Sequence, residues 1–400
     1  MNVRAVSVKE YGIADFQYIA AGAAILASGG GGSYRDTVAV LEELAGSGWS
    51  GSVAVQDYDG ATNCCVLALM DSPDAADNMT LADVEDSIAN TISTFEQATG
   101  VTLGCVIPVE IGSINSIVTL LAAARSDNAI RCVVGGDGAG RAVPELPQTT
   151  YGSSAFLAAS PCSLANDAGP NAVMQSATLN AATAGQVESL AGGVVSAFGS
   201  FSGIALWPSN PSNDFALAGN YLVGTLSQTR ALGEFLLTSA APPSTVDVAR
   251  RIADITGRAA TPTVTNSYIT SVTQSTTSAS LDSGIIRLDN APDQDSSTET
   301  HYLYNLNESL IMYSSLSNVP DIIAPDSICY YSESTGRGFS NATDDLAVYF
   351  DSVTGKSTGR PVSVIKVDAA PEFYKTTGVV ASFAGLLRRI GYAGALPYPG

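Results

Sequence analysis

Histidine and basic residues are scarce in this 400-residue chain. His301 is the only histidine, so zinc sites built on two or three histidines are excluded, and a histidine-based catalytic triad could use only this residue. Lysine and arginine total 18 against 38 acidic residues, and the formal net charge is −20. A field of this sign repels phosphate backbones and anionic membranes. We therefore expect a small-molecule substrate, no nucleic-acid partner and no membrane partner.

Long apolar runs and paired cysteine motifs are also missing. No stretch of about 18 apolar residues occurs, and the first 16 residues lack the apolar core of a secretory signal. The six cysteines show no Cys-x-x-Cys spacing. Cys105 and Cys132 lie in apolar segments typical of buried strands, which favours free thiols in a reducing compartment. These features predict a cytoplasmic protein, and whether it forms a homo-oligomer is left open.

Helical and strand patterns alternate over the first part of the chain. Helices are expected at 14–27, 80–100 and 113–128, and nearly continuous apolar strands at 63–73, 101–112 and 129–140. This alternation predicts an α/β domain with a mostly parallel sheet flanked by helices, assigned to residues 1–165. Residues 166–400 are assigned to a C-terminal domain that is helical at first. From about Thr261 it is β-rich, because Thr, Ser, Val, Ile and Tyr recur in short segments between turns.

Four glycines at 29–32 lie between two predicted helices. Ser33 and Asp36 form a capping-box pattern that starts the second helix. Free N–H groups there carry positive partial charge and suit an anion or a carbonyl oxygen. The run is not a P-loop, because no Gly-Lys-Ser/Thr follows, and not a dinucleotide fingerprint, because a helix precedes it. A tight helix–helix turn is the alternative interpretation.

Charged residues follow two of the predicted strands. Glu110 and Asn115 lie in VIPVEIGSINS, where they could supply a base or metal ligand or could form a helix N-cap network. Asp137, Arg141 and Glu145 lie in GGDGAGRAVPEL, where glycine and proline fix the backbone around three charges. Such a group can shift the pKa values of its members, and a structural ion network is the alternative. Since ligands of open α/β sheets bind beyond the strand ends, we expect one shared pocket.

Segments along most of the chain resemble the DUF917 family of S-methyl thiohydantoin desulfurase-like proteins. They include ILASGGGGS, PVEIGSIN, YNLNESL, VPDIIAPDS, PVSVIKV, RRIGYAGALPYP and the most specific one, GDGAGRAVPEL. The resemblance implies an α/β domain followed by a β-rich domain, and hydrolysis of a cyclic amide of thiohydantoin or hydantoin type with release of sulfur. The chain departs from the family at DAADNMT, which lacks a usual Glu-Lys pair, and at GQVESLAGGVVSAFG, which lacks a common arginine.

The mechanistic hypothesis is hydrolysis at the C2 carbon of a thiohydantoin-like ring. Asp137 or Glu110 would be the general base, Arg141 would bind a carboxylate or imide of the substrate, and Glu145 would orient Arg141 or bind a metal. The backbone of the glycines would stabilise the developing anion. The predicted catalytic residues are Glu110, Asp137, Arg141 and Glu145, and the predicted substrate-binding residues are Gly30, Gly31, Gly32, Ser33 and Asn115.

A cofactor and two competing functions are left open. If a divalent metal ion is bound, its expected ligands are Glu110, Asp137 and Glu145, since an oxygen-rich set favours a hard ion over zinc. The lost charged positions would also fit a non-catalytic small-molecule-binding protein, or a subunit of a hydantoinase- or oxoprolinase-like system. A plain hydantoin or lactam ring-opening enzyme would open the ring without releasing sulfur.

Overall fold

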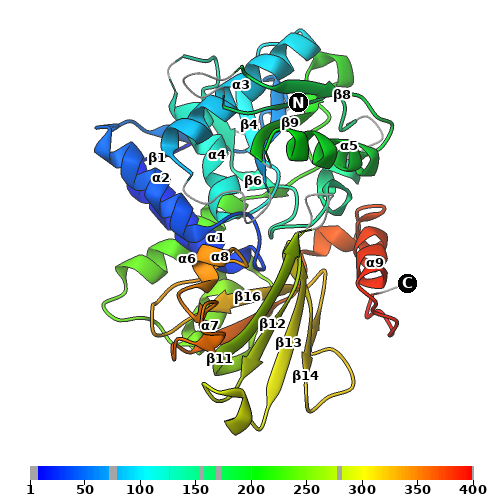
Figure 1. The fold of residues 1–400 in the computed structure, drawn as a ribbon. Coiled ribbons are helices and arrows are strands. Elements are labelled where there is room, and N and C mark those ends of the chain that lie inside the picture. Colours follow the sequence, from blue (N-terminus) through cyan, green and yellow to red (C-terminus); the bar gives the residue numbers. More distant parts are fainter. Residues whose placement is uncertain are drawn as a thin grey trace.

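Two large sheets of eight and seven strands organise the described part of the chain (Figure 1). The computed structural model describes residues 8–71, 79–125, 127–153, 157–167, 173–199, 201–276 and 282–398. The first sheet is covered by helices, and the second extends away from it in Figure 1. The predicted α/β domain followed by a β-rich region is therefore confirmed. No helix in these ranges combines the length and the apolar character that a membrane span requires.

The first sheet is mixed. Its strand order is β1 (Lys9–Tyr11), β2 (Val53–Gln56), β5 (Cys132–Val134), β4 (Cys105–Pro108), β3 (Cys64–Asp71), β9 (Phe201–Ser209), β7 (Cys162–Ala165) and β8 (Ser176–Leu179). Strands β2, β5, β4 and β3 are parallel, as the alternating pattern predicted, and the remaining pairs are antiparallel. Helices α3 (Leu81–Thr99) and α4 (Ser113–Ala124) lie between the parallel strands β3, β4 and β5, whereas β7 and β8 follow each other directly and pair antiparallel.

Helices cover both faces of this sheet. They are α1 (Ile13–Leu26), α2 (Tyr34–Gly46), α3 (Leu81–Thr99), α4 (Ser113–Ala124), α5 (Ala184–Ala197), α6 (Thr225–Thr238) and α7 (Thr245–Thr256). Strand β3 shows why the sheet needs two covers: Cys65, Leu67 and Leu69 belong to one hydrophobic core, while Val66 and Ala68 belong to a second core on the other face. Helix α5 contributes to the second core, and the other helices contribute to the first.

The second sheet is antiparallel. Its order is β15 (Ile322–Ile323), β14 (Glu308–Ser314), β13 (Thr300–Leu306), β12 (Asp282–Asp289), β11 (Ala260–Thr276), β19 (Val362–Val367) and β16 (Ser327–Tyr331). The long strand β11 pairs with β19 through its first half and with β12 through its second half. Its register is irregular between Pro262 and Ser267, where the strand changes partner. The sheet therefore curves into a near-barrel.

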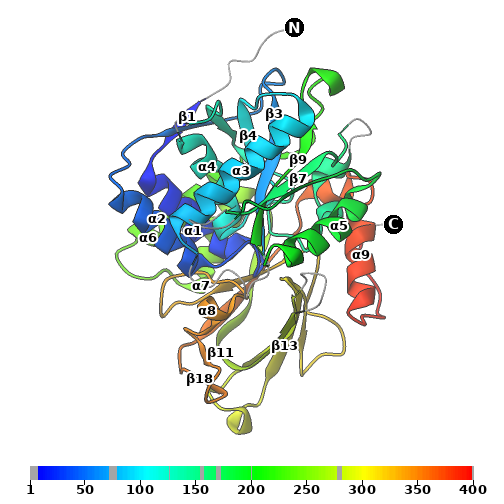
Figure 2. The same ribbon diagram turned by 45° about the horizontal axis from the view of Figure 1, so that its top comes forward.

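Shorter elements complete the described chain. They are β6 (Gly136–Asp137) paired with β10 (Leu222–Val223), β17 (Phe350–Asp351) paired with β18 (Lys356–Ser357), α8 (Thr343–Leu346) and α9 (Val379–Arg389), together with 3-10 turns at Leu146–Gln148, Thr150–Ser153, Pro211–Asn213, Gln294–Ser296 and Pro371–Tyr374. Helix α9 lies on the same side of the molecule as α5 and opposite α2 and α6 (Figure 2).

The two sheets share one core. Helix α6 packs against α1, and α7 packs against α6 and the second-sheet strands β11 and β19. The core around α1 also takes in Cys329, Tyr331, Ile365 and Val367 of the second sheet. All six cysteines lie in the described part, and all are free and buried, as Cys105 and Cys132 led us to expect. Since burial removes a thiol from solvent and oxidant alike, none of these residues is an exposed nucleophile.

Candidate functional site

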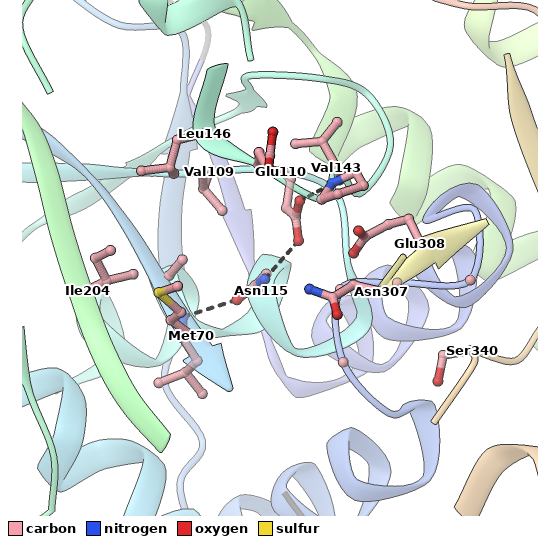
Figure 3. Close-up of a pocket in the computed structure, with 18 of the residues that line it drawn as sticks. Met70, Val109, Glu110, Asn115, Val143, Leu146, Ile204, Asn307, Glu308 and Ser340 are labelled. Atoms are coloured by element: carbon pink, nitrogen blue, oxygen red, sulfur yellow. Dashed lines mark hydrogen bonds between the residues drawn. The ribbon is translucent and has the colours of Figure 1, made fainter. Parts of the chain in front are cut away.

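A pocket of about 120 Å³ lies where the two sheets meet, beyond the carboxyl ends of β3 and β4 (Figure 3). Its walls come from the glycine loop (residues 29–33), from β3, from the start of α4, and from loops of the second sheet. The polar lining consists of Ser33, Glu110, Asn115, Glu145, Glu188, Asn307, Glu308, Ser340 and Asn341. The apolar lining includes Leu69, Met70, Val109, Val143, Leu146, Ile204 and Leu206. Seven of the predicted site residues therefore line one pocket: Gly30, Gly31, Gly32, Ser33, Glu110, Asn115 and Glu145.

The glycine loop is a wall of this pocket. Gly31 and Gly32 have φ angles of 69° and 89°, in the left-handed region that favours glycine. A Cβ atom on Gly31 would lie 2.2 Å from the Cα of Gly112, and one on Gly30 would lie 2.0 Å from Oε1 of Glu308. Among the described residues, the backbone N–H groups of Gly31, Gly32 and Ser33 donate to no protein acceptor. They remain available to a ligand.

The start of helix α2 is occupied by the protein itself. The N–H groups of Tyr34 and Arg35 donate to the two carboxylate oxygens of Asp345, at 3.1 and 3.2 Å. The Ser33 hydroxyl accepts from the N–H of Asp36, as its capping pattern predicted, and donates to Asp344 at 2.7 Å. The partial positive charge at this helix N-terminus is therefore balanced by carboxylates of the protein itself. The free N–H donors in the pocket wall belong to the glycines before the helix.

Glu110 is held by two hydrogen bonds. Its Oε1 accepts from Nδ2 of Asn115 at 2.9 Å, and its Oε2 accepts from the N–H of Val143 at 2.7 Å (Figure 3). The amide orientation of Asn115 is fixed in turn, because its Oδ1 accepts from the N–H of Leu69 at 3.0 Å. Burial raises the pKa of Glu110 to about 8, while these hydrogen bonds act in the opposite direction.

Glu308 is a site residue that sequence reasoning missed. It follows Asn307, which alone separates β13 from β14 and adopts a left-handed φ of 58°, a conformation that asparagine tolerates better than most residues. The Glu308 side chain is buried, and its Oε2 has no hydrogen-bond partner among the residues that the structure describes. Figure 3 shows its carboxyl group facing that of Glu110. Burial, reinforced by Glu110, raises the pKa of Glu308 well above its usual range. The segment YNLNESL contained the signal, an Asn-Glu pair between two strand patterns.

Asp137 does not line the pocket. It is fully buried, and its Oδ2 accepts from the N–H groups of Ala139 and Gly140 at 2.8 and 2.7 Å. It therefore stabilises the glycine-rich turn that follows β6, and burial raises its pKa to about 6. The expectation that Asp137 faces the ligand is corrected by this position, because the residue lies outside the pocket lining and N–H groups of its own loop occupy Oδ2.

Arg141 also lies behind the pocket wall. Its guanidinium is fully buried, lies over the ring of Phe383, and donates to the carbonyl oxygens of Ala142, Ser309, Pro325 and Asp326 at 2.8–3.2 Å. The expected contact with a substrate carboxylate or imide is therefore not supported. The arginine instead connects the first part of the chain to the second, and its charge lowers the pKa values of Glu308 and Glu110 against the larger effect of burial.

Two further glutamates line the pocket with part of their surface exposed. Glu145 pairs with Arg389 at the end of α9, and not with Arg141 as expected. Glu188 on α5 accepts from the N–H of Leu146 at 3.0 Å, and burial raises its pKa to about 7. No sequence pattern singled out Glu188, because it is one polar position in an ordinary amphipathic helix.

The expected metal ligands are not gathered. Both oxygens of Glu110 accept N–H hydrogen bonds, Asp137 points into its own loop, and Glu145 pairs with Arg389. In the part of the chain that the structure describes, no group of three His, Cys, Asp or Glu side chains is arranged to hold a metal ion. Glu110, Asp137 and Glu145 are therefore not arranged to bind a divalent ion together.

Comparisons with known proteins agree with this architecture. The N-terminal domain model of the S-Me-THD-like family matches residues 14–176, and its C-terminal domain model matches residues 182–381, so the resemblance seen in the sequence is confirmed. A crystal structure of a protein from Chromobacterium violaceum is similar with a TM-score of 0.77, over 98% of this chain and 99% of that chain, at 24% identity. That likeness shows the fold. The comparison with curated proteins finds no match.

Proposed function

Because the chain belongs to the S-Me-THD-like family, we propose that it is a hydrolase that acts on a cyclic amide of thiohydantoin or hydantoin type and releases sulfur from a thiohydantoin-like ring. One observation carries the proposal. Two buried carboxyl groups, Glu110 and Glu308, face each other in a pocket that also contains free backbone N–H groups. Hydrolysis at a ring carbon needs a general base, a general acid, and hydrogen-bond donors that stabilise the negative charge of the transition state. This pocket offers a candidate for each of them.

The environments of the two carboxyl groups assign their roles. Glu110 receives hydrogen bonds from Asn115 and Val143, which favour its ionised form, whereas Oε2 of Glu308 receives none. The pair therefore loses its first proton from Glu110, with a pKa of about 8, while Glu308 stays protonated. Glu110 is the general base and Glu308 is the general acid in this proposal.

The proposed hydrolysis exchanges the sulfur on C2 for the oxygen of a water molecule. Glu110 accepts one proton from a water molecule as the water oxygen bonds to C2 of the ring. The C2–S bond then breaks, and the sulfur leaves with one proton from Glu308, as a thiol from an S-alkyl ring or as hydrosulfide (HS⁻) from a C2=S ring, while the oxygen remains on C2 as the carbonyl of a hydantoin. The water's second proton is lost from that oxygen to the deprotonated Glu308, and Glu110 returns its proton to the ring nitrogen or to solvent.

The remaining pocket residues stabilise negative charge or limit the access of water. Negative charge that develops at C2 substituents can be stabilised by the N–H groups of Gly31, Gly32 and Ser33, because these donors are fixed before the reaction begins. The apolar side chains of Val109 and Ile204 limit the water around the ring, which strengthens each of these interactions.

A variant of the acid tests the proposal. Glu308→Gln resembles the protonated side chain in shape and charge, so the fold and the melting temperature should be retained. It cannot transfer a proton, so we expect kcat on S-methyl thiohydantoin or 2-thiohydantoin to fall about 10²- to 10⁴-fold. Thiol release, followed with a thiol reagent, and ring integrity, followed by chromatography, are the measurements.

The control is Glu42→Gln, which removes an exposed carboxylate on α2 outside the pocket and should leave turnover unchanged. Full activity in both Glu308→Gln and Glu110→Gln would contradict the assignment. Saturable binding without turnover by the wild-type protein would favour a binding protein or subunit, and ring opening without sulfur release would favour a hydantoin or lactam hydrolase.

A further inference from the structure

The charged lining of the pocket has one sign. Its charged residues are the four glutamates Glu110, Glu145, Glu188 and Glu308. Of the 18 lysine and arginine residues, Arg4 alone lies outside the described ranges, and none of the others lines the pocket. His301 does not line it either, because it lies on β13 between Glu299 and Asp321. An anionic group on a ligand would therefore meet no described side-chain cation.

The two arginines nearest to the pocket are already engaged. Arg141 directs its guanidinium at four backbone carbonyl groups and is fully buried behind the wall. Arg389 pairs with Glu145 at the rim. Releasing either one to bind a ligand would leave buried carbonyl groups or a glutamate without a partner, which costs free energy.

The glutamates lie in two pairs along the pocket. Glu110 and Glu308 are the buried pair, and Oε2 of Glu308, which has no hydrogen-bond partner among the described residues, is free to form a hydrogen bond with the ring. Glu188 binds the N–H of Leu146, and Figure 3 places Leu146 on the other side of Glu110 from Glu308. The partly exposed pair, Glu145 and Glu188, therefore lies on the Leu146 side of the pocket, and the charge of Glu188 still contributes to the raised pKa of Glu308.

We propose that the pocket accepts a ring whose substituent is neutral or positively charged and discriminates against one that carries a carboxylate. This inference rests on the proposed function. The ring N–H groups face Glu110 and Glu308, the reacting atom faces the N–H groups of Gly31 and Gly32, and the substituent extends towards Glu188. The loop donors are committed to the reacting atom, and Arg389 is already paired with Glu145. A carboxylate at the far end would therefore meet the ionised side chain of Glu188, and like charges brought together with little solvent between them oppose binding.

Three hydantoins of similar size test the inference without requiring sulfur release. They carry 3-aminopropyl, butyl or 2-carboxyethyl at ring C5, and their dissociation constants for the wild-type protein are measured by calorimetry at pH 8, where Glu188, with a pKa of about 7, is mostly ionised. We expect the cationic and neutral compounds to bind at least tenfold more tightly than the carboxylate. The advantage of the cation over the neutral compound should shrink between 0.05 and 0.5 M salt, because the rim pair is partly exposed to solvent.

A variant of Glu188 tests whether this residue causes the selectivity among the three compounds. Glu188→Gln should weaken the aminopropyl compound severalfold, strengthen the carboxyethyl compound and leave the butyl compound unchanged, whereas Glu42→Gln should change none of the three. Tightest binding of the carboxyethyl compound would overturn the inference and leave the proposed function standing. If none of the three rings binds, the proposed function fails and the inference fails with it.

Discussion

The hydrogen bonds of a single side chain, Glu110, determine where its proton can be. Both of its oxygens accept from donors that cannot reverse, because Val143 offers a backbone N–H and the Asn115 amide is oriented by Leu69. A proton on Glu110 must therefore use one of the lone pairs that these two donors leave free. The residue is consequently able to exchange protons with a ligand while it remains anchored to the protein, which is the arrangement that general base catalysis needs.

The raised pKa of Glu110 has a consequence for stability. Its pKa rises from about 4.3 in an unfolded chain to about 8 in the folded protein. The folded protein therefore binds more protons than the unfolded chain between these values. The contribution of Glu110 is fully present at low pH and is lost as pH rises towards 8. We expect the free energy of unfolding to fall more steeply from pH 5 to pH 8 in the wild type than in Glu110→Gln, as urea titrations at several pH values will measure.

The variant should also be less stable than the wild type at pH 5, because a glutamine amide would oppose the Asn115 donor. The slope, and not the absolute stability, is therefore the informative quantity. Equal slopes in the two proteins would show that Glu110 does not hold a proton in the folded state at neutral pH.

Contacts between elements depend on two glycines where α1 crosses α6. A Cβ atom on Gly22 would lie 2.0 Å from the carbonyl oxygen of Thr229, and one on Gly233 would lie 1.7 Å from that of Tyr18. The two helix backbones therefore touch directly, and no side chain fits between them. This crossing connects the N-terminal helix to a helix more than 200 residues later in the chain, and so fixes the glycine loop that follows α1.

Alanine at one of these positions tests the crossing. Gly233→Ala should destabilise the protein by about 2 kcal/mol or more, since the new methyl group can be accommodated only if a backbone moves. Gly193→Ala is a matched control, because Gly193 is exposed on α5 and a methyl group added there would have no atom within 4 Å. It should stabilise the protein by about 0.5–1 kcal/mol through helix propensity. Chemical denaturation measures both, and equal effects would contradict the close crossing.

The elements that could be predicted from sequence are those with local signals. Ser33 and Asp36 marked the start of α2, and the apolar run around Cys105 marked a buried strand. The partners of Arg141 could not be predicted, because the carbonyl groups of Pro325 and Asp326 are more than 180 residues away and carry no recognisable pattern. Glu308 was missed for the same reason: its role depends on a tertiary contact with Glu110.

At the scale of the whole molecule, the two sheets behave as one cooperative unit. The core around α1 contains Cys329 and Ile365 from the second sheet, and Asp345 from the same region accepts hydrogen bonds from the start of α2. Neither part can lose its structure without exposing apolar surface of the other. A single unfolding transition is therefore expected for the whole chain.

The capping carboxylate Asp345 offers a test of this coupling. Asp345→Asn keeps one acceptor but removes the charge that receives N–H groups from Tyr34, Arg35 and Ser340. We expect a loss of about 1–3 kcal/mol, with far-UV circular dichroism and tryptophan fluorescence shifting together. Because Trp49 and Trp207 both lie in the part of the molecule built around the first sheet, a fluorescence transition that separates from the dichroism transition would contradict cooperative unfolding.

The position of Glu308 at a tight corner of the second sheet, opposite Glu110 after a strand of the first, has one more implication. Each half of the polypeptide supplies one member of the acid–base couple. Chemistry of this kind is therefore a property of the joined molecule, and a fragment that ended between the halves would be left with a lone carboxyl group and nothing to exchange its proton with.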